Sequence, residues 1–173
     1  MFILRGLDFL VERIGRVTSW LVVLLILTMT YEVVSRYVFD NPTLWSFDIT
    51  YMLGAVFFLY SASYVLLHGG HVRVDLFYTR FSAKMKSIVD IVFIPMFFFT
   101  SYSILTQQAW RAAFRALEVG ETSMSGIWEP TTVPLRFIIA LGFSLLLLQG
   151  IFWFIRETIS LKSGKKPTEE SND

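Results

Sequence analysis

Four long apolar runs constrain the fold of this chain more than any other feature of its sequence. Each run can cross about 30 Å of hydrocarbon as an α-helix of roughly 20 residues. Lipid offers the backbone no hydrogen-bond partner, so only helices and closed β-barrels span a membrane. Runs such as Leu21–Leu27 lack the alternation of a barrel strand. We therefore predict an all-α membrane protein with four transmembrane helices, at about 17–34, 49–67, 88–109 and 133–155.

The composition agrees with this interpretation and excludes several functions. Hydrophobic residues make up 54% of the 173 residues and charged residues only 17%, whereas soluble domains carry about 25% charged residues. A net charge of +1 gives no reason to expect a nucleic acid as partner. The absence of cysteine excludes disulfides, thiolate metal sites and a cysteine nucleophile. Because the sequence contains no recognisable catalytic motif, we predict a protein that is not an enzyme and uses no cofactor of its own.

Lysine and arginine residues indicate the orientation, because cytoplasmic loops carry an excess of them. Eleven of the 15 lie before the first run, between the second and third runs, or after the fourth. This distribution places both termini and the second loop in the cytoplasm. We interpret residues 1–162 as one membrane domain and the polar segment 163–173 as a disordered cytoplasmic tail.

Three segments outside the runs have the pattern of amphipathic helices. Residues 1–16 and 76–87 each separate an apolar face from a charged face at helical spacing, and residues 110–118 do the same over a shorter length. Such helices lie in the plane of the membrane, with their apolar faces against the acyl chains. We predict in-plane helices at about 1–16 and 76–87, and a short separate one at 110–118.

Few charged residues lie within the runs, and each is within about one turn of a run's end: Glu32, Asp90 and Arg136. Glu32 precedes Arg36 by four residues, which is the spacing of an ion pair on one helix face. The runs carry no charge at mid-depth, where a self-sufficient ion-coupled transporter normally needs one. Two alternatives remain open at this point. One is an independent homodimeric secondary transporter of four helices with Glu32 as its coupling acid, and the other is a membrane anchor subunit of a redox enzyme.

Three short motifs occur in a characteristic order along the chain. Ser35-Arg36-Tyr37-Val38-Phe39 closes the first run, Trp45-Ser46-Phe47-Asp48 opens the second, and His71-Val72-Arg73-Val74-Asp75 follows the second. With the four-run layout, they resemble the small membrane subunit, or Q component, of the tripartite ATP-independent periplasmic (TRAP) transporters over most of residues 1–160. One departure is the single acid Asp48 after Phe47, where the family often has two adjacent acids.

The resemblance implies a non-catalytic scaffold subunit of a sodium-coupled transporter that imports an organic acid. A periplasmic binding protein (the P component) would deliver the substrate. A large elevator-type membrane subunit (the M component) would hold the substrate and sodium sites. The chain would reside in the bacterial inner membrane, in contact with lipids. Its motif residues at a subunit or lipid interface would be Arg36, Trp45, Asp48, His71, Arg73 and Asp75.

Two further hypotheses concern the loops. The outer loops carry acidic residues that could form part of a docking surface for the binding protein: Glu118, Glu121 and Glu129. On the cytoplasmic side, we expect His71, Arg73 and Asp75 to fix the turn from the second span onto the in-plane helix at 76–87.

Overall fold

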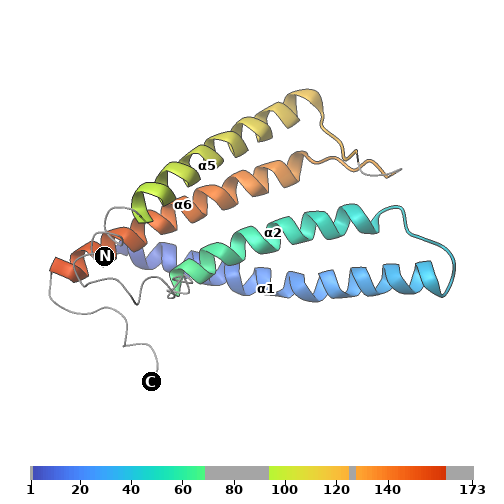
Figure 1. Ribbon diagram of the computed structural model, residues 1–173, viewed down its shortest axis with the longest axis horizontal. Coiled ribbons are helices and arrows are strands. Elements are labelled where there is room, and N and C mark those ends of the chain that lie inside the picture. Colours follow the sequence, from blue (N-terminus) through green and yellow to red (C-terminus); the bar gives the residue numbers. More distant parts are fainter. Residues whose placement is uncertain (1, 69–93, 125–127, 163–173) are drawn as a thin grey trace, which may run out of the picture.

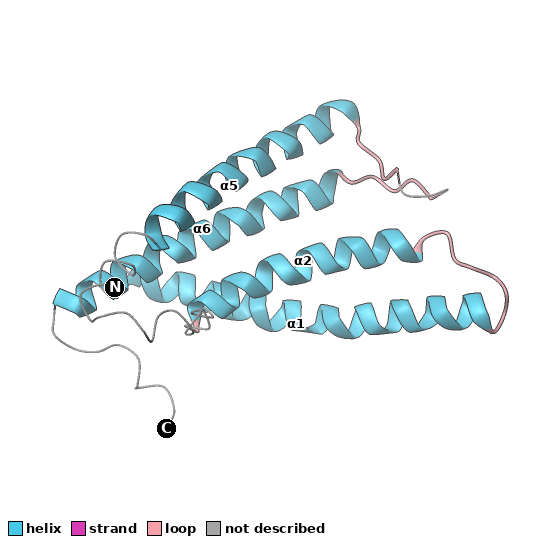
Figure 2. Ribbon diagram, in the orientation of Figure 1, coloured by secondary structure: helices cyan, strands magenta, loops and turns pink. Residues whose placement is uncertain are grey.

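The computed structural model describes residues 2–68, 94–124 and 128–162, and this part of the chain folds into four helices that form two antiparallel hairpins (Figure 1). The helices are α1 (Phe2–Tyr37), α2 (Ser46–Leu67), α5 (Ile94–Val119) and α6 (Val133–Lys162). The described residues form no named strand (Figure 2). The predicted fold class, an all-α membrane protein, is confirmed. The predicted in-plane helix at 76–87 and the predicted tail at 163–173 lie outside the described residues.

The two hairpins lie side by side and touch through α2 and α6. Helix α1 packs on α2, α2 packs on α6, and α5 packs on α6. The loops 38–45 and 120–132 lie at one end of the molecule, which we call the loop end. The first residues of α1 and the last residues of α6 lie at the opposite end, the termini end (Figure 1). Both ends of the helical part are therefore on one side of the bundle, and the assignment of that side to the cytoplasm stays a prediction.

The first helix differs from the expected layout. We predicted an in-plane helix at 1–16 followed by a separate span at 17–34, but α1 runs without a break from Phe2 to Tyr37. The physical reason is that nothing near residue 16 breaks a helix: the nearest weak helix former is Gly15, and it is packed against α2. The amphipathic start and the apolar span are therefore one helix, with a candidate membrane span at Gly6–Tyr37.

The third span also differs from expectation. The predicted spans at 49–67 and 133–155 correspond to α2 and to most of α6, and both helices carry candidate membrane spans. Of the predicted span 88–109, residues 88–93 lie outside the described part. Helix α5 does not stop at Ala109 but continues to Val119, so the separate amphipathic helix expected at 110–118 is wrong. Its described part does not qualify as a candidate span, although those of α1, α2 and α6 do.

Helix α5 ends where the chain first supplies a helix-stopping residue. Gly120 has a φ of +63°, in the left-handed region that glycine adopts readily. The N–H of Glu121 then donates to the carbonyl oxygen of Ala116 at 3.0 Å, as at many helix C-termini. No glycine or proline lies between Ala109 and Val119, which explains why the helix continues past the expected end.

A glycine lies at the close approach of each of the three packed helix pairs. A Cβ added to Gly15 would lie 2.3 Å from the Tyr64 ring, where α1 meets α2. One added to Gly142 would lie 2.6 Å from Leu59, where α6 meets α2, and one added to Gly150 would lie 2.2 Å from the Phe98 ring, where α6 meets α5. Small residues allow close packing between membrane helices, which gain little from the hydrophobic effect.

Candidate functional site

The most densely connected polar cluster at the loop end surrounds Glu32, near the end of α1. The Glu32 carboxylate accepts a hydrogen bond from Arg36 Nε at 2.9 Å, and Arg36 also forms an ion pair with it. Its other oxygen accepts from the Thr43 backbone N–H at 3.1 Å and from the Thr43 hydroxyl. Glu32 thus holds the loop 38–45 back against the helix that precedes it, and its acceptor sites are used within this chain.

The same loop is fixed by an aromatic contact next to the start of α2. The rings of Tyr31 and Trp45 stack with their centroids 5.7 Å apart, and Trp45 is 37% exposed. Stacked aromatic pairs contribute beyond the apolar area that they bury. The Trp45 motif therefore packs against α1 and does not stand free in the loop.

Asp48 connects the two hairpins at the loop end. It lies in the first turn of α2, where a negative charge is favoured by the helix dipole, and it is only 2% exposed. Its Oδ1 accepts a hydrogen bond from the hydroxyl of Ser123, which belongs to the loop between α5 and α6. Asp48 is thus a buried tie between the start of one hairpin's second helix and the turn of the other hairpin.

The loop 120–132 is itself closed by backbone and side-chain bonds. The N–H of Thr132 donates to the Glu121 carbonyl at 2.9 Å, and Ser123 N–H donates to the Pro130 carbonyl at 2.9 Å. The Glu121 carboxylate accepts from Arg136 Nε at 3.2 Å and from a second guanidinium nitrogen at 2.5 Å. These hydrogen bonds from Arg136 hold the pKa of Glu121 below its usual range, so the pair stays ionised at neutral pH.

A second cluster lies at the termini end, between α1 and the end of α2. Glu12 pairs with Arg16 at 3.1 Å and lies 3.4 Å from His68 Nε2. The Tyr64 ring is enclosed by Gly15 on one side and by the His68 ring, at 4.3 Å between centroids, on the other. These contacts hold the first turns of α1 on α2. Within the described residues, no three His, Asp or Glu side chains are grouped closely enough to hold a metal ion.

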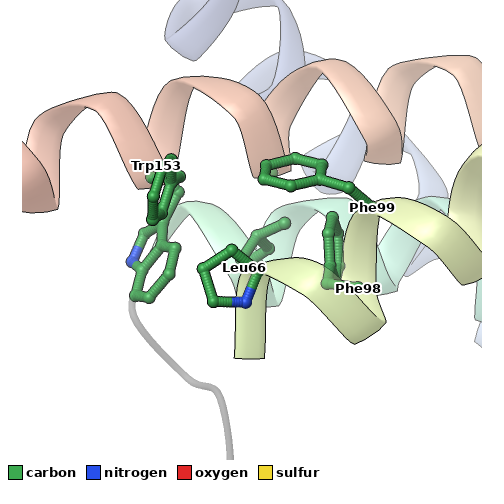
Figure 3. A pocket seen from close by; sticks show the side chains of 7 residues that line it. Leu66, Phe98, Phe99 and Trp153 are labelled. Atoms are coloured by element: carbon green, nitrogen blue, oxygen red, sulfur yellow. The ribbon is translucent and has the colours of Figure 1, made fainter. Parts of the chain in front are cut away.

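Two apolar hollows lie along the bundle, and neither has the features of a substrate site. The first lies near the termini end, where Figure 3 shows Leu66, Phe98, Phe99 and Trp153 around it, and Pro95, Gly150 and Phe154 complete its lining. The second is an open groove between α2 and α5 with α6 as its floor, lined by Ala55, Phe58, Leu59, Ala62, Tyr102, Ile139, Phe143 and Leu146. Apart from the Tyr102 and Trp153 ring systems, these linings are hydrocarbon, so they suit acyl chains or apolar side chains.

The structure distributes the residues singled out from the sequence over several places. Arg36, Trp45 and Asp48 lie at the loop end, where Arg36 contacts Glu32 and Asp48 contacts Ser123. Of the acids expected to meet a binding protein, Glu118 and Glu129 are exposed and Glu121 is occupied by Arg136. The remaining three motif residues lie outside the described part of the chain: His71, Arg73 and Asp75.

Sequence reasoning missed the partners of these residues. Thr43 and Ser123 complete two of the ties at the loop end, but short hydroxyl residues in loops give no pattern that would reveal them. Arg136 was noted near the end of its run, but its pairing with Glu121 was not. Trp110, on α5, donates from its Nε1 to Ser144 Oγ on α6 at 3.0 Å. Ser144 is the middle residue of the candidate span Val133–Ile155. Arg111, the residue after Trp110, therefore lies close to the level of the middle residue of that candidate span. The expectation that no span carries a charge at mid-depth in the membrane stays a prediction.

Comparison with known proteins supplies the family. A family model described as "Tripartite ATP-independent periplasmic transporters, DctQ component" matches residues 25–159, which is most of the chain. The matched segment contains the described parts of α2, α5 and most of α6, together with the Glu32, Asp48 and Glu121 ties. A search of curated proteins gave no match.

Proposed function

Because the chain belongs to the DctQ component family of the tripartite ATP-independent periplasmic transporters, we propose that it is the non-catalytic scaffold subunit of such a transporter. It supports a large elevator-type membrane subunit that carries the substrate and sodium sites. A periplasmic binding protein delivers an organic acid, and sodium entry drives its uptake. The chain itself uses no cofactor, lies in the bacterial inner membrane with both termini in the cytoplasm, and contacts lipids and these two partners.

One observation carries this proposal: three acids at the loop end are used to hold helices and loops of this chain together. Glu32 binds Thr43 and Arg36, Asp48 binds Ser123, and Glu121 binds Arg136. The two hollows described above are apolar, so neither offers a set of groups that could orient a carboxylate or a sodium ion. A subunit whose acids hold its own helices together, and which leaves substrate and sodium binding to a partner, acts as a scaffold.

The exposed charge of Arg111, near the level of the middle of the α6 span, is compatible with this role. A guanidinium group stays protonated in proteins, so it cannot take up and release a proton during a transport cycle. Glu32 is the acid that an independent transporter would use for ion coupling. Its carboxylate oxygens already accept hydrogen bonds from Arg36 and Thr43 of the same chain.

Glu32→Gln distinguishes the scaffold from an independent transporter. We expect the variant to weaken the loop 38–45, because an amide keeps one acceptor for Thr43 but loses the charge that holds Arg36. Recovery of the intact complex after purification should fall, whereas the dependence of the remaining uptake on sodium should not change. Sodium titration of uptake in proteoliposomes, normalised to the amount of complex, measures both quantities. An intact complex whose uptake no longer responds to sodium would support the alternative with Glu32 as coupling acid.

The exposed acids near the loop end give a second test, directed at the binding protein. We expect Glu118→Lys with Glu129→Lys to raise the concentration of loaded binding protein needed for half-maximal uptake several-fold at low salt, because rim charges mainly steer association. Adding Glu121→Lys should increase the effect but also break the pair with Arg136, so the double variant is the cleaner probe. If the wild-type protein and the double variant need the same concentration of binding protein at every salt concentration, these acids are only solvated.

For His71, Arg73 and Asp75 the proposal is structural. Their place after α2 suits residues that fix the turn toward the segment 76–87, with Arg73 able to bind lipid phosphates.

A further inference from the structure

The outward face of α5 carries a line of polar residues that runs along most of the helix. Thr100, Ser103, Gln107, Arg111 and Arg115 are all exposed and follow one another at steps of three and four residues, which places them on one side of a helix. We call this set the α5 stripe. The opposite side of α5, with Ala113 and Ala116 fully buried, is the side that packs on α6.

Contacts between α5 and α6 show how deep the stripe lies. Trp110 binds Ser144, the middle residue of the α6 span, and the Phe114 and Phe137 rings are 5.8 Å apart, nearer the loop end. At 1.5 Å per residue, Ser144 is roughly 16 Å from either end of its span. Arg111 therefore lies level with the middle of the α6 span and Arg115 about one turn closer to the loop end.

An arginine at this level needs a partner that hydrocarbon cannot provide. Long basic side chains reach the interface from positions near a helix end, whereas Arg111 lies about two turns before the end of α5 at Val119. Within the described part of the chain, neither Arg111 nor Arg115 forms an ion pair with any acid. The two are four residues apart, so they also repel each other on the helix surface.

The other helices present large apolar side chains outward. Those of α1 include Val17, Trp20, Ile26, Leu27 and Met29, and Phe58 on α2 is 74% exposed. Such side chains meet acyl chains at no cost. Helix α5 also exposes apolar side chains, such as Phe97 and Ile104, but its stripe adds two arginines that hydrocarbon does not satisfy.

We propose that the α5 stripe is the face that docks against the large membrane subunit, through a transmembrane helix of that subunit that places a carboxylate opposite Arg111. This inference rests on the proposed function and specifies which face meets the partner. Charge complementarity selects the occupant: a helix with hydrogen-bonding side chains and an acid satisfies the stripe along its length, whereas a second copy of this chain would bring two more arginines to the same place.

Site-specific photocrosslinking in the assembled complex tests the docking face directly. A photoreactive residue at Gln107 should crosslink to the large subunit, whereas the same residue at Ile26 of α1, which is 59% exposed, should crosslink mainly to lipid. A crosslink from Gln107 to lipid or to a second copy of this chain, in a complex that contains the large subunit, would overturn the inference and leave the proposed function standing. If the wild-type chain binds no large subunit, the proposed function fails as well.

Charge reversal tests the acid opposite Arg111. We expect Arg111→Glu to lower the amount of co-purified large subunit at least about tenfold, and Arg111→Lys to lower it much less, because lysine keeps the charge. Arg13→Glu, at an exposed arginine on α1, is the matched control and should have little effect. Equal recovery for Arg111→Glu and Arg13→Glu would contradict the proposal. The Gln107 crosslink keeps it testable even if Arg111→Glu does not fold, since that probe leaves both arginines in place.

Discussion

Replacement of Gly15 by leucine is expected to separate α1 from α2 and to destabilise the protein by about 1–3 kcal/mol, the usual cost of overpacking a close contact. An added Cβ alone would lie 2.3 Å from the Tyr64 ring and 2.9 Å from its Cβ. The Tyr64 ring cannot turn aside easily, because the His68 ring lies 4.3 Å away on its other side. The midpoint of thermal unfolding in detergent measures the effect.

Gly6→Leu on the same helix is the matched control for this substitution. Nothing lies within 4 Å of a Cβ at that position, so only the helix propensity of the residue changes. Leucine favours a helix over glycine by roughly 0.5–1 kcal/mol, so Gly6→Leu should be neutral or slightly stabilising. The two variants are thus expected to shift the unfolding midpoint in opposite directions. Equal shifts would show that α1 does not pack on α2 through Gly15.

Replacement of Asp48 by alanine is expected to release the loop 120–132 from α2 at a cost of roughly 2–3 kcal/mol. Hydrogen bonds to charged groups contribute about 1.5–3 kcal/mol, and a carboxylate in the first turn of a helix adds a few tenths more. Asp48 is 2% exposed, so water can reach the Ser123 hydroxyl that loses its acceptor only if the loop moves away from α2. The unfolding midpoint and the rate of proteolysis within 120–132 should both respond.

A double-mutant cycle with Ser123→Ala separates this tie from general damage to α2. If Asp48 and Ser123 act on each other, the double variant should lose less than the sum of the single losses, with a coupling of about 1 kcal/mol or more. Glu129→Ala removes an exposed acid from the same end and should leave stability within about 0.5 kcal/mol of the parent. Additive losses for Asp48 and Ser123 would mean that the two residues stabilise the protein independently.

The helix of the third span continues past its predicted end. The predicted span ends at Ala109, shortly before Arg111 and Arg115, and hydropathy counts such charges against a span. Periodicity across that boundary would have shown one continuous amphipathic helix, since polar residues recur at helical spacing from Thr100 to Arg115. Periodicity could not show that Trp110 lies beside Ser144, because that contact depends on the position of α5 along the axis of α6.

The hydrogen bonds at the loop end illustrate a second limit of prediction from local sequence patterns. Asp48 was singled out as part of a short motif, and its position before an apolar run predicted the start of a helix. Its burial and its bond to Ser123 join residues that are 75 positions apart. A bond over that distance depends on the packing of two hairpins, which local sequence patterns do not encode.

The sequence by itself determined that this protein is helical and lies in a membrane. A long apolar run without the alternation of a barrel strand can satisfy its backbone hydrogen bonds in lipid only as a helix. It also determined the positions of α2 and of most of α6, since those runs are bounded by polar loop residues. Only the tertiary structure decided which helices touch, because each contact depends on a glycine meeting a particular side chain on another helix. The same packing decided that Trp110 lies beside Ser144, and so placed the exposed Arg111 near the level of the middle of the α6 span.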